Sequence, residues 1–197
     1  PDLKTIIRRL HEVLSLYERI LQLDPEDRET RERALVILYD YARETQMDMV
    51  WNMLYQQAAR ALDAHADDWQ GHYYRGVALL ARINRFEIED RNPLQIRTDL
   101  AAARQANPDE PDIVYHLALW HLFQARTLVQ LARTDEAARE RSLARELMDT
   151  CLLEHPDSLE TRLNQAWFLL ELRTLQDTPE IVAELQAVLA TLERMLL

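Results

Sequence analysis

Histidine, cysteine and serine are the residue types through which this sequence could perform metal or nucleophilic chemistry. Asp68 and His72 would share a helix face, but two ligands are too few for a zinc site. His116 and His121 lie five residues apart and would diverge by about 140° on a helix. Cys151 is the only cysteine, and no serine has a recognisable base beside it. The sequence therefore predicts a protein that is not an enzyme and has no catalytic residue, metal ligand or cofactor.

Composition and charge exclude several other classes. Glycine supplies only 2 of 197 residues, although dinucleotide folds and phosphate-binding loops depend on it. The net charge of −11 disfavours broad binding to nucleic acid or anionic lipid. No apolar run is long enough to span a bilayer, and no signal peptide is visible. We therefore expect no nucleic-acid partner, no membrane insertion and a cytoplasmic location, or a periplasmic one if a signal has been removed.

Prolines next to capping residues mark where the helices that would carry a functional site begin. Asp24-Pro25 and Thr178-Pro179 are two examples, because proline suits the first helical position and Asp or Thr caps the free amides. Between such marks apolar residues recur every three or four positions, as in amphipathic helices. The sequence therefore predicts an all-α protein. About nine helices are expected, at residues 3–22, 27–44, 47–64, 68–85, 93–106, 110–132, 135–154, 157–173 and 179–196.

Four segments of the chain resemble one another. They open at Pro25, Ala66, Pro108 and Pro156. Ten residues further on, three of the four carry a small residue, as a close helix crossing requires: Gly76, Ala118 and Ala166. Cys151 falls at another repeat position that faces a crossing helix, so we expect it to pack there, and the alternative is a reactive thiol.

This pattern resembles the tetratricopeptide repeat, a family of helix pairs with a small residue at repeat position 8 and proline at position 32. Position 8 is matched by Gly76, Ala118 and Ala166, and position 32 by Pro25, Pro108 and Pro156. The resemblance implies a right-handed α-solenoid of antiparallel helix pairs. It also implies one domain over residues 1–197, composed of a half-repeat 1–24 and units 25–65, 66–107, 108–155 and 156–197.

The units are longer than the 34 residues of that family. Their starts lie 41, 42 and 48 residues apart, which gives excesses of 7, 8 and 14. Two helical turns take about 7.2 residues and four take about 14.4, so whole extra turns would keep each apolar stripe facing the same way. We therefore expect helices of at least five turns at 110–132 and 135–154, and a partly ordered loop at 84–92.

The resemblance implies a concave groove lined by the first helix of each pair. The side chains expected to contact a partner there are Tyr39, Tyr73, Tyr74, Tyr115, His116, Phe123, Asn164 and Trp167. In the last unit the groove positions also hold Glu160, Leu163, Leu170 and Glu171. Because aromatic residues suit interfaces, we expect at least three of Tyr73, Tyr74, Tyr115 and Trp167 to be exposed. The alternative is that the longer helices turn some of them into the core.

The sequence thus predicts a non-catalytic scaffold or adaptor. Its partner would be an apolar peptide or helix of another protein, with basic flanks that complement the acidic surface. The alternative is a structural module that spaces other domains or associates with itself through its apolar terminal helices. Because the first helix has no preceding partner and the chain ends on Met195-Leu196-Leu197, we expect a fragment of a longer protein.

Overall fold

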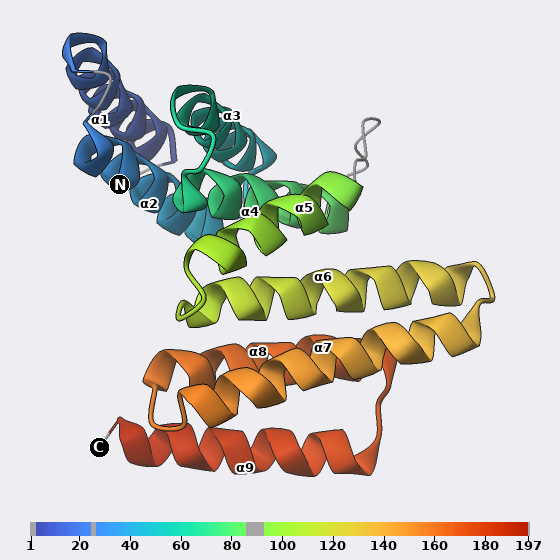
Figure 1. The fold of residues 1–197 in the computed structure, drawn as a ribbon. Helices are drawn as coiled ribbons and strands as arrows, with labels where there is room; N and C mark the ends of the chain where they lie inside the picture. The colour runs from blue at the N-terminus through green and yellow to red at the C-terminus, as the bar shows by residue number, and fades with distance from the viewer. Residues whose placement is uncertain (1–2, 25–26, 86–92, 197) are drawn as a thin grey trace. The chain divides into compact units, whose positions relative to one another are not determined.

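A computed structural model describes residues 3–24, 27–85 and 93–196 (Figure 1). Within these ranges the chain forms nine α-helices and no β-strand, which confirms the all-α fold class. The helices are α1 (Leu3–Leu23), α2 (Arg28–Thr45), α3 (Asp48–Ala64), α4 (Trp69–Arg85), α5 (Pro93–Ala106), α6 (Pro111–Gln130), α7 (Thr134–Glu154), α8 (Leu159–Leu175) and α9 (Pro179–Met195).

The helix boundaries expected from prolines and apolar spacing are correct to within two residues. Helix α6 has 20 residues and α7 has 21, so both exceed five turns, as the whole-turn argument requires. Of the loop expected at 84–92, Asn84 and Arg85 belong instead to the end of α4. The remainder, 86–92, lies outside the described residues.

Short polar side chains cap three of the helix starts. Asp27 Oδ1, Ser158 Oγ and Thr178 Oγ1 accept from the backbone N–H three residues later, at 3.0, 3.2 and 3.5 Å. Two turns place a residue other than glycine in the left-handed region, Gln46 after α2 and Ala132 after α6, with φ of 56° and 58°. A chain with two glycines therefore makes its helix turns without glycine, even though glycine would adopt this conformation more readily.

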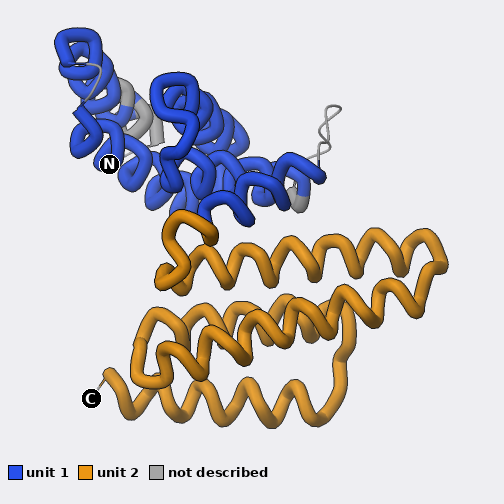
Figure 2. Tube along the Cα trace, viewed as in Figure 1, with its two compact units in different colours: residues 1–103 blue, residues 104–197 orange. Residues whose placement is uncertain are grey.

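The chain divides into two compact units, residues 1–103 and 104–197 (Figure 2). In the first unit α2 contacts α1, α3 and α4, and α3 also contacts α4. Its fully buried side chains include Leu35, Leu38, Leu54 and Ile96. These come from the apolar stripes of α2, α3 and α5, so amphipathic spacing directs the burial.

Both glycines lie in α4, where neighbouring helices approach closely. A Cβ on Gly76 would lie 3.0 Å from Leu100 Cγ of α5, and a Cβ on Gly71 would lie 2.9 Å from Leu62 Cγ of α3. The small residue expected at Gly76 therefore accommodates a close crossing. Gly71, which the repeat pattern did not single out, accommodates a second one.

In the second unit α6 lies beside α7, and α8 lies beside α9 (Figure 1). Helix α6 also contacts α8, and α7 contacts α8. One buried apolar cluster, called here the unit 2 core, draws on all four helices. Its members are Ala118, Leu122, Ala144, Met148, Ala166, Phe168, Leu169, Leu172, Ile181, Leu185, Val188 and Leu192. Ala118 and Ala166, the small residues of the repeat pattern, both belong to it.

Candidate protein-binding surface

Most of the side chains expected to line a groove are covered. Tyr39, Tyr73, Tyr74, His116 and Asn164 are buried, and Tyr115 and Phe123 are half-buried. Only Trp167 is well exposed, at 54% of its surface. The expectation that at least three of Tyr73, Tyr74, Tyr115 and Trp167 would be exposed is therefore wrong, and the alternative of rotation into the core holds for Tyr73 and Tyr74.

The buried tyrosines of the first unit pack against one another. The ring of Tyr39 lies 5.4 Å from that of Tyr74, 6.2 Å from that of Tyr73 and 6.3 Å from that of Trp51, measured between centroids. The Tyr73 and Tyr74 rings are 4.9 Å apart. Tilted and edge-to-face rings at these distances stabilise each other, so this cluster joins α2, α3 and α4 and leaves these rings little surface for a partner.

In the second unit, the two polar side chains expected in the groove, His116 and Asn164, both form hydrogen bonds with Asp112 of α6. Asn164 Nδ2 of α8 donates to Asp112 Oδ1 of α6 at 2.7 Å. His116 Nδ1 lies 2.7 Å from the backbone oxygen of Asp112 and so donates to it. Asn164 therefore ties α8 to α6, and neither side chain has the exposure that a peptide ligand would need.

Among the expected groove positions, an exposed apolar stripe lies on α8. Leu159, Leu163, Trp167 and Leu170 have 37, 42, 54 and 40% of their surface exposed. Their spacings of four, four and three residues place them on one side of the helix. These four residues are called the α8 face below. Leu163, Trp167 and Leu170 were assigned to the groove from the repeat pattern, whereas Leu159 was not, although its spacing from Leu163 could have indicated it.

Carboxylates border the α8 face. Glu160 and Glu171 are both exposed and lie on the same side of α8 as Trp167. Arg126 Nη2 of α6 pairs with Glu171 Oε2 at 3.3 Å and contacts Thr174 Oγ1 at the same distance. A ligand that covers Trp167 would therefore meet Glu160 and the ion pair of Glu171 with Arg126.

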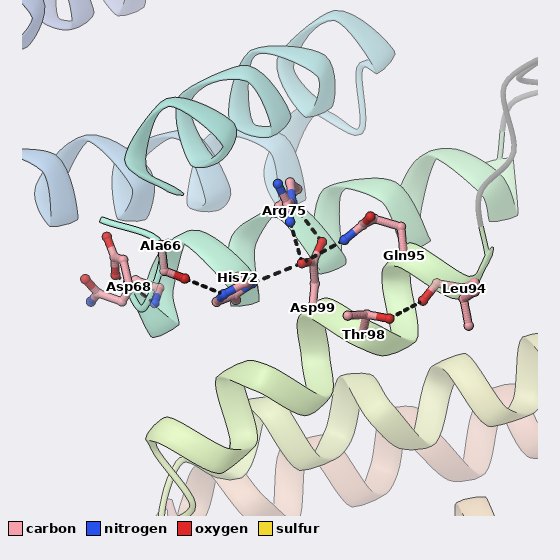
Figure 3. Close-up of polar contacts among 9 residues, drawn as sticks. Ala66, Asp68, His72, Arg75, Leu94, Gln95, Thr98 and Asp99 are labelled. Atoms are coloured by element: carbon pink, nitrogen blue, oxygen red, sulfur yellow. Dashed lines mark hydrogen bonds and ion pairs between the residues drawn. The ribbon is translucent and has the colours of Figure 1, made fainter. Parts of the chain in front are cut away.

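A polar cluster in the first unit lies between α4 and α5 (Figure 3). The Asp99 carboxylate, with no exposed surface, accepts hydrogen bonds from Arg75 and, at 3.1 Å, from Gln95 Nε2. His72 Nδ1 lies 3.0 Å from Asp99 Oδ1, and His72 Nε2 lies 3.0 Å from the Ala66 backbone oxygen. Arg75, Gln95 and His72 all bond to Asp99, so the cluster joins α4 and α5. Sequence spacing paired His72 with Asp68, whose carboxylate instead accepts from the backbone N–H of Gln70.

Two other features of the described residues could suggest chemistry. A cleft among α1, α2 and α3 is lined by Arg31, Arg60 and Gln57, but Glu18 Oε1 accepts from Arg60 at 2.9 Å and from Gln57 at 3.2 Å. Cys151 is 1% exposed, and burial raises the pKa of its thiol. Arg60 in the cleft is thus paired internally, and Cys151 packs as expected.

Within the described residues, no group of three or more His, Cys, Asp or Glu side chains is arranged to hold a metal ion. The same residues contain no helix with the length and apolarity needed to cross a membrane. No protein-family model matches the chain, and no curated protein is significantly similar to it.

Proposed function

We propose that this protein is a non-catalytic scaffold, acting in the cytoplasm, that binds an apolar segment of another protein through the α8 face. Its helices would form a right-handed solenoid of antiparallel pairs, like those of tetratricopeptide repeats. The observation that carries the proposal is the exposed stripe of Leu159, Leu163, Trp167 and Leu170, because soluble chains seldom leave contiguous large apolar side chains uncovered.

Helix contacts support the repeat architecture within each unit. Helix α2 contacts the next helix, α3, and also the one after it, α4. Helix α6 likewise contacts α7 and α8. Contacts between alternate helices are expected when helix pairs stack, since the first helix of each pair then lies beside the first helix of the next.

Charge indicates the chemistry of the partner. The chain carries −11 overall, and Glu160 and Glu171 border the α8 face. An apolar segment flanked by Lys or Arg would bury the four apolar side chains and place its cations beside these carboxylates. Such rim charges mainly favour encounter and orientation, while a central aromatic residue such as Trp167 supplies more of the affinity.

The test is selection of displayed random 20-residue peptides on the purified chain, followed by affinity measurement on three variants. Recovered peptides should be apolar with basic flanks and should bind Leu163→Ala and Trp167→Ala at least tenfold more weakly. Leu143→Ala is the matched control, because Leu143 of α7 is 43% exposed and lies outside the α8 face. Peptides that bind Trp167→Ala and the unaltered chain equally well would refute the proposal.

Self-association is a second candidate, favoured by a separate stripe on α1. Val13, Leu16, Ile20 and Leu23 are 37, 58, 41 and 88% exposed and recur at spacings of three and four. Sedimentation over a wide range of concentrations decides between the candidates. Self-association should give a dimer that Leu16→Glu dissociates, whereas a chain that remains monomeric at the highest concentration excludes it.

A further inference from the structure

We infer that the α8 face receives an amphipathic α-helix from another protein, and that this helix docks on α8 in the way that α8 docks on α6. The inference rests on the proposed function and specifies the partner. It follows from the difference between α6, whose side is packed against another helix, and α8, whose corresponding side is exposed.

The repeat aligns α6 with α8 at a separation of 48 residues, so that Tyr115, Leu119 and Leu122 correspond to Leu163, Trp167 and Leu170. In α6 these side chains are buried or half-buried. Leu122 is 2% exposed, and Tyr115 and Leu119 pack against the unit 2 core, which includes residues of α8. The corresponding side chains of α8 are 40 to 54% exposed. Helix α8 thus leaves exposed the positions that in α6 lie on the side facing α8, the side from which Asp112 and Arg126 bond to α8.

The covering helix, α8, shows which residues suit such a position. It contributes Ala166, Phe168, Leu169 and Leu172 to the unit 2 core. Phe168 and Leu172 lie on the same side of α8 as Asn164, which bonds to α6, whereas Ala166 lies on the other side. The docked helix should therefore carry apolar residues at helical spacing on the same side as its polar residue.

A polar contact sets the direction of the docked helix. Asp112 of α6 accepts a hydrogen bond from Asn164 of α8 at 2.7 Å, and the repeat places Glu160 of α8 where α6 has Asp112. The carboxylate of Glu160 suits a partner Asn, Lys or Arg at the position that Asn164 occupies in α8. A carboxylate there would instead be repelled.

Backbone hydrogen bonding favours a helix over an extended segment. An extended peptide needs partners for its backbone N–H and C=O groups, and the described residues contain no strand with which it could pair. A helix satisfies these groups internally, so its side chains alone need to complement the α8 face.

The experiment uses a synthetic peptide with the sequence of residues 157–176. Leu159→Gln, Leu163→Gln, Trp167→Gln and Leu170→Gln in the peptide replace the whole α8 face and leave apolar the side that α8 turns toward the unit 2 core. The peptide should become helical on binding, as measured by circular dichroism. Trp167→Ala in the protein should weaken the binding at least tenfold, while Leu143→Ala should leave it unchanged. Gln165→Pro in the peptide, which breaks the helix and keeps the apolar residues, should abolish binding.

A charge exchange tests the predicted polar contact. Asn164→Asp in the peptide should weaken binding to the unaltered protein and strengthen binding to Glu160→Lys. Equal binding of the proline and parent peptides would overturn the inference. So would a parent peptide that fails to bind, or the loss on Trp167→Ala of a dimer of the chain itself, which would identify the occupant as a second copy.

The two proposals can fail separately. If displayed peptides depend on Trp167 but lack a helical pattern, the scaffold function stands and the helical partner is wrong. If neither displayed peptides nor the synthetic helix depends on Trp167, the proposed function fails together with the inference.

Discussion

Arg75 and Asp99 form a two-point ion pair in which the carboxylate is completely buried. Arg75 Nε donates to Asp99 Oδ2 at 2.8 Å and Arg75 Nη2 donates to Asp99 Oδ1 at 2.7 Å. The hydrogen bond to Asp99 also raises the pKa of Arg75. Because the two residues come from α4 and α5, the pair joins these helices with a fixed geometry.

Asp99→Ala should lower the free energy of unfolding by about 3 kcal/mol, because it removes the acceptor of Arg75, His72 and Gln95 while they remain partly buried. Urea unfolding followed by circular dichroism measures the change. Arg97→Ala, at an exposed position of the same helix, is the control and should change the stability by less than about 0.5 kcal/mol. Equal losses in the two variants would show that the buried pair does not stabilise the fold.

Gly71→Ala should destabilise the first unit by about 1 kcal/mol, because the new Cβ would lie 2.9 Å from Leu62 Cγ. Gly71 is in the first turn of α4, where the helix-propensity gain from alanine is small. Thermal unfolding of Gly71→Ala, alone and combined with Leu62→Ala, provides the measurement. The Gly71→Ala penalty should fall in the Leu62→Ala background, where only the contact with the Ala58 backbone oxygen at 3.3 Å remains, and an unchanged penalty there would locate the strain elsewhere.

The helices could be predicted from the sequence because their signals are local. Proline, capping residues and apolar spacing act within one or two turns, so α9 starts at Pro179 as expected. The ion pair of Asp99 could not be predicted, since its partner Arg75 lies 24 residues away and no local pattern distinguishes either residue. Local signals therefore predict the helices, whereas the polar contact between α4 and α5 depends on two residues far apart in the chain.

The candidate surface was predicted only in part, for a related reason. The repeat pattern gives each residue a position around its helix, and it placed both Tyr74 and Trp167 in one groove. Whether a position is open depends on the size of its neighbours. Tyr74 meets the rings of Tyr39 and Tyr73, whereas no ring contact covers Trp167 among the described residues. The repeat pattern thus predicts the exposed positions of Leu163, Trp167 and Leu170 correctly. It fails for Tyr39, Tyr73 and Tyr74, because these rings are buried against one another.

The charge of Glu110 should make the stability depend on pH. Partial burial raises the pKa of the Glu110 carboxyl above its ordinary 4.5, and the nearby charge of Asp112 raises it further. Protonation of Glu110 therefore favours the folded state, and its contribution is lost as the pH rises through the raised pKa. Glu110→Gln should gain stability relative to the unaltered protein between pH 4 and pH 7, as measured by urea unfolding at each pH.

Glu136 is the matched control for this titration. A hydrogen bond from Arg133 holds the pKa of Glu136 below its ordinary value. Its contribution is therefore present above the ordinary 4.5 and lost as the pH falls through the lowered pKa, so Glu136→Gln should lose stability relative to the unaltered protein as the pH rises from below the lowered pKa to 7. Relative stabilities that change in the same direction for both variants would contradict these assignments.

Cys151 should react slowly with a thiol reagent in the native protein. The thiolate is the reactive form, burial raises the pKa of the thiol, and only 1% of the residue is exposed. Modification by a chromogenic disulfide should be at least about 100-fold slower in buffer than in denaturant, because it must wait for local opening. Similar rates in the two conditions would place Cys151 at an accessible position and contradict its packing.

Tyr73→Ala and Trp167→Ala should separate the core from the candidate binding surface. Tyr73 is 4% exposed and packs against Tyr39 and Tyr74, so its truncation should cost about 3 kcal/mol in unfolding free energy. Trp167 is 54% exposed, and its truncation should cost less than about 1 kcal/mol. Chemical denaturation of both variants measures this contrast. If Trp167→Ala were as destabilising as Tyr73→Ala, Trp167 would be a core residue and its loss could not be used as a specific test of partner binding.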